Sequence, residues 1–284
     1  MAPPTPQTLV APRGTRGAPR SPPPPKARRA PGNPWRSSVT RRAPVRYAKA
    51  FFDLQLRFAD RVATLSGLPL SRVLLEYTNL YIRFGLGRDF NASDPTWQAY
   101  LAGLKGPACI DEWTYDLYLT RHGSRSGPTV VATVGCFSYA PLSGERIRLH
   151  FHDADLDGQS PLAIERASRR RAELTGLFQH VKRTARTSLR VVGASWLYNV
   201  EAYRRLFPSS YLATARPMPH CFQHLPLWGQ FLDRHGAVRE KPARDFLDRL
   251  DHQSSVDGLD RCFPFQALSV EAPAQHFYDF YGLS

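Results

Sequence analysis

Two histidines and three aspartates lie close together near the middle of the chain, in the segment His150-Phe-His152-Asp153-Ala-Asp155-Leu-Asp157. Residues two apart on a strand share a face, so His150 and His152 could together hold a transition metal with Asp153 or Asp155. Imidazole also titrates near neutral pH, which suits a general base. The alternative is an acidic turn beside two partly exposed histidines, without a ligand.

The same aspartates support a second metal hypothesis. The pattern Asp153-x-Asp155-x-Asp157-Gly158 matches the first six positions of a calcium loop, in which alternate carboxylates point inward and glycine permits a sharp turn. The twelfth position, where a bidentate glutamate is expected, is Ile164, and a strand is predicted before the loop instead of a helix. The calcium site, the transition-metal site and the ligand-free turn therefore remain alternatives.

Hydrophobic periodicity predicts the elements that position these residues. Spacings of three and four indicate amphipathic helices over 47–65 and from Pro69 to Gly85, and a short helix around 97–104. Alternating β-rich runs separated by turn residues predict a three-stranded antiparallel meander. A long helix follows, with Ser160-Pro161 at its start. The predicted meander strands are 113–120, 129–139 and 146–152, and the long helix ends near Thr184.

The remaining chain continues the alternation of strands and helices. We predict a buried strand 189–197, a short helix 201–207, a strand 211–215, a hairpin formed by 227–232 and 237–240, a helix 242–250 and a strand 265–271. Four aromatic residues near the end recur at helical spacing and are predicted to lie in the core: Phe277, Tyr278, Phe280 and Tyr281. The fold class is therefore α/β: one domain, residues 45–284, whose central, mainly antiparallel sheet is flanked by helices in the order ααβββαβαβ, plus a C-terminal extension.

Residues 47–215 resemble the GNAT acetyltransferase superfamily in the order of their elements. The best local match is Asn199-Val-Glu-Ala202-Tyr-Arg-Arg-Leu-Phe207, which looks like the family's N-x-x-A-x-x-L-[YF] helix beside the pantetheine arm of acyl-CoA. The resemblance implies an acyl-CoA cosubstrate in a splay between the fourth and fifth strands. It also implies that Asn199 contacts the cofactor and that Ala202 lets the cofactor approach. His150 or His152 would then deprotonate the acceptor amine.

Two positions depart from the family pattern. The loop before the long helix lacks the glycine-rich [QR]-x-x-G-x-[GA] sequence that closes backbone N–H groups around pyrophosphate; Gly158, Gln159 and Ser160 take that place, after three aspartates that would repel phosphate. Phe207 stands where many members carry the tyrosine that protonates the departing thiolate. Tyr203 would substitute for it, or else Tyr198 or Tyr211.

The positive charge of the chain is concentrated at its N-terminal end. The formal net charge is +14, but residues 1–50 carry eleven Lys/Arg and no acidic residue, which leaves 27 basic and 24 acidic residues downstream. Twelve of the 25 prolines lie in the same segment. Such a composition cannot form a packed core, so residues 1–44 are predicted to be a disordered basic tail. The tail is either a nucleic-acid or phosphate tether, a targeting segment, or without function.

Other motifs are weaker. Eight basic residues of the long helix and its end form either a solvated face or a phosphate-binding stripe: Arg166, Arg169, Arg170, Arg171, Lys182, Arg183, Arg186 and Arg190. Four cysteines without a C-x-x-C pair are predicted to be reduced and buried. Ser195 lacks the second glycine of a nucleophile elbow.

The leading functional hypothesis is an N-acyltransferase acting on a small-molecule or peptide amine. The alternatives are a non-catalytic protein tethered to nucleic acid or phosphate through its tail, and a protein that binds a divalent metal at residues 153–158. No membrane span or export signal is predicted, and a cytoplasmic location is expected.

Overall fold

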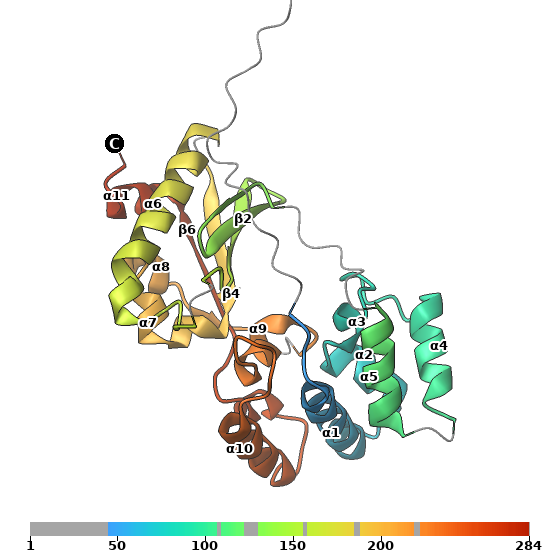
Figure 1. Cartoon of the computed structure of the whole chain (residues 1–284). Helices are drawn as coiled ribbons and strands as arrows, with labels where there is room; N and C mark the ends of the chain where they lie inside the picture. The colour runs from blue at the N-terminus through green and yellow to red at the C-terminus, as the bar shows by residue number, and fades with distance from the viewer. Residues whose placement is uncertain are drawn as a thin grey trace, which may run out of the picture. The chain divides into compact units, whose positions relative to one another are not determined.

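The computed structural model describes residues 45–106, 109–121, 130–155, 158–184, 188–218 and 222–283. The predicted disordered tail, residues 1–44, lies outside this range. All described residues belong to one compact unit. The fold is α/β, as predicted, with a mostly antiparallel sheet and helices packed beside it (Figure 1).

The N-terminal part of the described chain is helical. Helix α1 (Lys49–Ser66) ends where Gly67 adopts a φ of +68° and donates its N–H to the Ala63 carbonyl at 2.9 Å. The helix predicted from Pro69 to Gly85 forms in two pieces, α2 (Leu70–Tyr77) and α3 (Leu80–Arg83). The break is stabilised by the buried Gln55 of α1, whose side-chain oxygen accepts the Asn79 backbone N–H at 2.9 Å. The short helix expected near Trp97 is α4 (Pro95–Gly103), capped by Asp94.

The first strand of the predicted meander is wrong, because residues 113–120 lie within a helix, α5 (Ile110–Arg121). Trp, Tyr and Thr give this segment high β-propensity, but packing overrides it. The Tyr118 hydroxyl accepts the Tyr47 N–H at 3.0 Å, and the Trp113 indole donates to the Tyr100 carbonyl at 3.0 Å. The meander nevertheless has three strands, because the predicted strand 129–139 is divided at Gly135 into β1 (Ala132–Val134) and β2 (Phe137–Leu142).

The described part of the chain contains one six-stranded sheet with the order β1-β2-β3-β4-β6-β5. Strands β3 (Arg146–Phe151) and β4 (Arg190–Ser195) agree with the predicted ranges, and β6 is Leu268–Pro273. All neighbouring strands are antiparallel except β3 and β4, which are parallel. A parallel pair needs a crossover, and here it is α6 (Ala167–Thr184), preceded by the short 3-10 helix η1 (Ile164–Arg166).

After β4 the chain forms the 3-10 helix η2 (Trp196–Asn199) and then α7 (Glu201–Arg204). The strand predicted at 211–215 is wrong: Pro208 caps a one-turn helix, α8 (Ser209–Leu212), which buries Tyr211. The edge strand β5 (Arg216–Pro217) follows and pairs with β6.

The predicted hairpin after residue 226 is also wrong. Helix α9 (Leu225–Trp228) and the 3-10 helix η3 (Gly229–Phe231) take its first arm, and one bridge, between Leu232 and Val238, is all that forms of the pairing. The predicted helix that follows is confirmed as α10 (Glu240–Asp251), and η4 (Leu259–Cys262) precedes β6.

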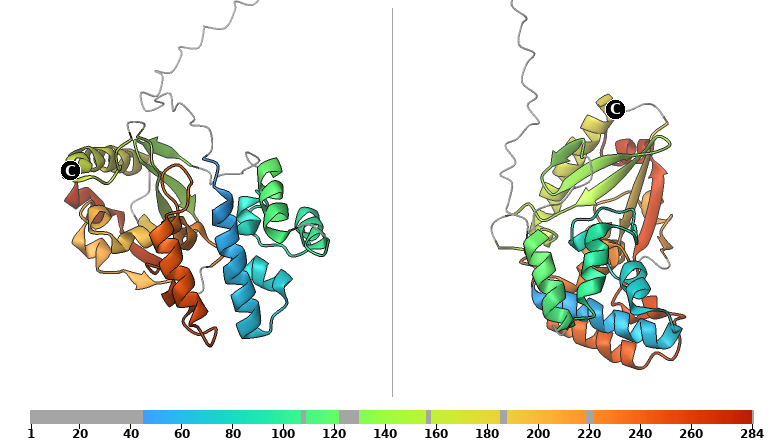
Figure 2. Two further views of the ribbon diagram at one scale, coloured as in Figure 1. Left: turned by 60° about the horizontal axis from the view of Figure 1, so that its bottom comes forward. Right: turned by 90° about the vertical axis from the view of Figure 1, so that its right-hand side faces the viewer.

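Two hydrophobic clusters hold these elements together. The first joins the helical segments, including α1 and α10, which lie side by side in Figure 2. The second lies between the sheet and α6, α7, α8 and the last helix, α11 (Ala274–Phe280). It contains Phe277, Tyr278 and Tyr281 in buried positions and Phe280 in a partly buried one, so the predicted core role of these aromatics is confirmed.

Candidate functional site at a gap between two parallel strands

Strands β3 and β4 separate halfway along their length. Their pairing covers three residue pairs, from Arg146 with Arg190 to Arg148 with Val192. On their outer sides, β3 stays paired with β2 to Phe151 and β4 stays paired with β6 to Ser195. Residues 149–151 and 193–195 therefore face each other across a gap in the interior of the sheet.

A cavity of about 260 Å³ opens at this gap. Residues 148–151 of β3 and 194–198 of β4 and η2 line it, together with Tyr203 of α7, Arg88, Pro226 and Gly229. Strand alternation decides which side chains can reach it from β3. Ile147 and Leu149 are buried in the core, whereas Arg146, Arg148 and His150 share the opposite face.

His150 is the titratable group best placed for proton transfer here. Burial, followed by the charges of Arg148, Arg88 and His152, lowers the pKa of His150 to about 4. Its Nε2 atom is buried and has no hydrogen-bond partner among the described residues. The ring is therefore neutral at pH 7 and can accept a proton, although it is a weaker base than the near-neutral imidazole that the sequence suggested.

Hydrogen-bonded tyrosines lie beside the gap. The side chains of Tyr203 and Tyr198 form a hydrogen bond, and the hydroxyls of Tyr198 and Tyr211 are hydrogen-bonded at 2.9 Å. Burial raises the pKa of all three hydroxyls above the ordinary value for tyrosine, so they stay protonated. Tyr198 and Tyr203 line the cavity, which leaves these two, of the three candidates, as possible proton donors there. Gly193 makes room for the hydrogen-bonded pair of Tyr198 and Tyr211, because a Cβ atom at this position would overlap both hydroxyls.

The acidic loop has a structural role that its sequence did not indicate. Asp155 is buried, and its carboxylate accepts hydrogen bonds from Arg170 at 3.0 and 3.1 Å and from Arg166. Arg169 lies 3.3 Å from the same carboxylate. Burial alone would raise the pKa of Asp155, but these hydrogen bonds and charges outweigh it and lower the pKa. This carboxylate therefore anchors the start of α6 and does not present an uncompensated negative charge to a phosphate.

The metal hypotheses gain no geometric support. Burial lowers the pKa of His152 although Asp153 opposes the shift, and one Asp153 oxygen accepts the Asp155 N–H at 3.1 Å. Asp157 lies outside the described residues. Within the described ranges, no group of three or more His, Cys, Asp or Glu side chains is placed to hold a metal ion.

The predicted cofactor contacts are not brought together at the cavity. Asn199 donates its amide hydrogens to the carbonyls of Trp196 and Gln266, both at 2.8 Å, so they hold the loop after β4. Ala202 is partly buried on α7. In the loop before α6, Gly158 is exposed with a φ of +85°, Gln159 accepts a hydrogen bond from Arg166, and Ser160 accepts the Leu162 N–H.

The basic residues of the long helix and its end divide into two groups: Arg166 and Arg170 are buried, whereas the other described members are exposed, namely Arg169, Arg171, Lys182, Arg183 and Arg190. Besides the arginines that face Asp155, Arg171 lies 4.5 Å from the centre of the Phe280 ring, Lys182 lies over Tyr278, and Arg190 pairs with Glu271. Arg186 is outside the described residues. Asp155 and Glu271 offset the charges of Arg166, Arg170 and Arg190, whereas a ring contact leaves the charges of Arg171 and Lys182 in place. The solvated face and the phosphate-binding stripe therefore remain alternatives.

The predicted burial of all four cysteines is wrong for Cys109, which is exposed because it sits at the start of α5, where its thiol bonds to Asp111. Cys136 and Cys262 are buried, as predicted, and Cys221 is outside the described residues. The Ser195 hydroxyl lines the cavity and accepts the Leu197 N–H at 3.1 Å, so it caps η2.

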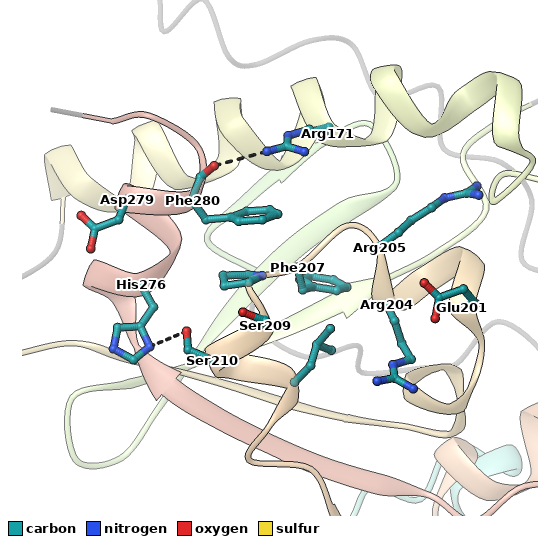
Figure 3. A pocket seen from close by; sticks show the side chains of 12 residues that line it. Arg171, Glu201, Arg204, Arg205, Phe207, Ser209, Ser210, His276, Asp279 and Phe280 are labelled. Carbon is teal, nitrogen blue, oxygen red and sulfur yellow. Dashed lines mark hydrogen bonds between the residues drawn. The ribbon is translucent and has the colours of Figure 1, made fainter.

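A larger cavity, about 650 Å³, lies among α6, α7, α8 and α11 (Figure 3). On its wall the Ser210 hydroxyl and His276 Nδ1 are 3.0 Å apart. Asp279 instead accepts a hydrogen bond from Gln275 at 2.7 Å. Among the residues described, no hydrogen bond joins Asp279 to His276, so these side chains do not form a Ser-His-Asp triad.

The sequence did not single out the two arginines that line the cavity, Arg88 and Arg148, or His224, whose pKa both arginines lower after the larger effect of burial. Arg148 could have been found, because it lies two residues before His150 and so shares its face. Arg88 and His224 are far from His150 in the sequence, and no local pattern links them. Comparisons with protein-family models, with curated proteins and with solved structures gave no significant match.

In the part of the chain that the structure describes, none of the helices combines the length and the apolar character needed to cross a membrane.

Proposed function

We propose that the protein is an N-acyltransferase that moves an acyl group from acyl-CoA to an amine at the gap between β3 and β4. The observation that carries the proposal is the separation of these strands beyond Arg148 and Val192, with a cavity at the point of separation. The GNAT resemblance implies an acyl-CoA in a splay between the fourth and fifth strands. The predicted fifth strand, 211–215, does not form, and the parallel strands that separate here are the third and fourth, β3 and β4.

The gap suits an extended ligand that contains amide groups. Backbone N–H and C=O groups inside a sheet normally bond to the neighbouring strand, but between residues 149–151 and 193–195 this pairing is absent. An extended chain can bond to such free strand edges, as peptides do when they add to a sheet. The pantetheine arm of acyl-CoA is a chain of this kind, with two amides.

The residues at the cavity can handle the protons of an acyl transfer. The amine nitrogen attacks the thioester carbonyl carbon, and the C–S bond breaks as the new C–N bond is completed. With its low pKa, His150 does not deprotonate a free ammonium ion; it accepts the proton once the attacking nitrogen carries positive charge. The Tyr203 or Tyr198 hydroxyl donates a proton to the departing thiolate.

Calorimetric titration of the full chain with acetyl-CoA and with CoA tests the proposal. We expect both to bind, because most of their contacts come from the pantetheine and nucleotide parts that they share. Absence of binding at high-micromolar ligand would end the acyltransferase hypothesis. Release of thiol from acetyl-CoA in the presence of an amine, lost in His150→Gln, would then establish transfer.

A further inference from the structure

The cavity at the gap carries a concentration of positive charge. Arg148 and Arg88 both line it, and both lower the pKa of His150 and of His224 after the larger effect of burial. These groups come from three separate parts of the chain: β3, the segment after α3, and the segment before α9. The fold thus gathers two permanent cations around the opening beside His150, and the charges of the same two arginines also reach His224.

Arg148 has no anionic partner among the described residues. Arg148 is half-buried, its Nε atom is buried without a hydrogen-bond partner, and the described residues provide it with no salt bridge. The groups that perturb the pKa of Arg148 besides burial are Arg88 and Arg146, both cationic. By contrast, the buried Arg166 and Arg170 both face the carboxylate of Asp155.

A partly desolvated guanidinium without an anion is costly, and a bound carboxylate or phosphate would satisfy its donors in a bidentate fashion. The distance between Arg148 and His150 indicates whether this anion belongs to the acceptor or to acyl-CoA. Side chains two apart on a strand lie roughly 7 Å from one another, given a rise of about 3.3 Å per residue. A small molecule can therefore place an anionic group at Arg148 and its amine at His150. In acyl-CoA, by contrast, the whole pantetheine arm separates the phosphates from the reacting thioester.

We propose that Arg148, assisted by Arg88, binds a negatively charged group of the acceptor, so that the substrates are small amines that bear a carboxylate or a phosphate. This inference rests on the proposed acyl transfer at the same gap. Arg148 acts as a specificity residue: it orients the amine toward His150 and takes no part in proton transfer.

Calorimetry on the full chain with two matched pairs of amines tests the inference: glycine against glycinamide, and O-phosphoethanolamine against ethanolamine, each in the presence of CoA. We expect the anionic member of at least one pair to bind about tenfold or more tightly than its neutral partner, the size expected of a charge-assisted hydrogen bond. Arg148→Gln should remove this difference and leave acetyl-CoA affinity unchanged.

Arg146→Gln is the matched control. Arg146 lies on the same face of β3, but it bonds to the Ser143 carbonyl and does not line the cavity, so the preference for the anion should persist in this variant. Equal binding within both pairs would overturn the inference, as would a loss of acetyl-CoA affinity in Arg148→Gln, which would assign this arginine to the CoA phosphates. Failure of acetyl-CoA to bind while the anionic amines still bind would refute the acyltransferase proposal and the role of these amines as acceptors, and would leave only an anion-binding site at Arg148.

Discussion

Replacement of Asp155 by Asn should lower the free energy of unfolding more than the replacement of any charged residue on the surface does. The Asp155 and Arg170 side chains are each 1% exposed, and Arg166 contacts the same carboxylate. Removing one member of a buried ion pair leaves an uncompensated charge and costs about 3–5 kcal/mol. Asn keeps one acceptor oxygen in nearly the same place, so we expect the lower end, about 3 kcal/mol.

The pH dependence of this difference has a definite sign. The pKa of Asp155 is lower in the folded than in the unfolded protein, so its stabilisation is complete above about pH 4 and is lost as the pH falls through the folded pKa. Asn does not titrate. The stability difference between wild type and Asp155→Asn should therefore be largest at neutral pH and shrink below pH 4.

Urea unfolding followed by tryptophan fluorescence at several pH values measures both quantities. Asp245→Asn is the control, because Asp245 pairs with Lys241 at 2.7 Å on an exposed face of α10, and its replacement should destabilise the protein far less than Asp155→Asn does. A cost below about 1 kcal/mol for Asp155→Asn, or a difference that does not change with pH, would refute the anchoring role.

Three further outcomes are expected. Gly193→Ala should destabilise the protein by about 1–3 kcal/mol in urea unfolding, because its methyl group overlaps the Tyr198 and Tyr211 hydroxyls; a neutral effect would contradict this packing. In an NMR titration, the ring signal that disappears in His150→Gln should show no protonation from pH 8 down to pH 5, since burial and neighbouring cations lower the pKa of His150 to about 4; a midpoint near 6.5 would disprove that environment. Limited proteolysis should remove the proline-rich N-terminal segment and leave a fragment that begins near Tyr47, just before α1, and protection of residues 1–40 would show that the tail is ordered.

The sequence predicted elements where one physical signal dominates. Apolar spacing was enough for α1, and strand alternation with flanking turns was enough for β3. Prediction from the sequence failed where tertiary contacts decide the local structure. Residues 113–120 have strand-like composition but form part of α5, since the Tyr118 hydroxyl accepts the N–H of Tyr47, just before α1, and the Trp113 indole donates to the Tyr100 carbonyl of α4.

The candidate site was predictable only in part. His150 and Tyr203 were identified, and both line the cavity. The arginines that donate hydrogen bonds to the Asp155 carboxylate lie eleven and fifteen residues away, beyond a loop. Sequence spacing therefore could not show that this carboxylate already has cationic partners. Arg88 reaches the same cavity from the segment after α3, and only the folded chain brings it there.

Calorimetry of acetyl-CoA binding to Ala194→Leu tests the central claim most directly. Ala194 lines the gap from β4, and a leucine there would fill space that the proposal assigns to the ligand. With the melting temperature monitored, we predict a loss of acetyl-CoA affinity of about tenfold or more, as expected when a ligand-sized space is filled. Thr133→Leu on the distant strand β1 should bind as wild type does. Unchanged acetyl-CoA affinity in a folded Ala194→Leu protein would contradict a ligand site between β3 and β4.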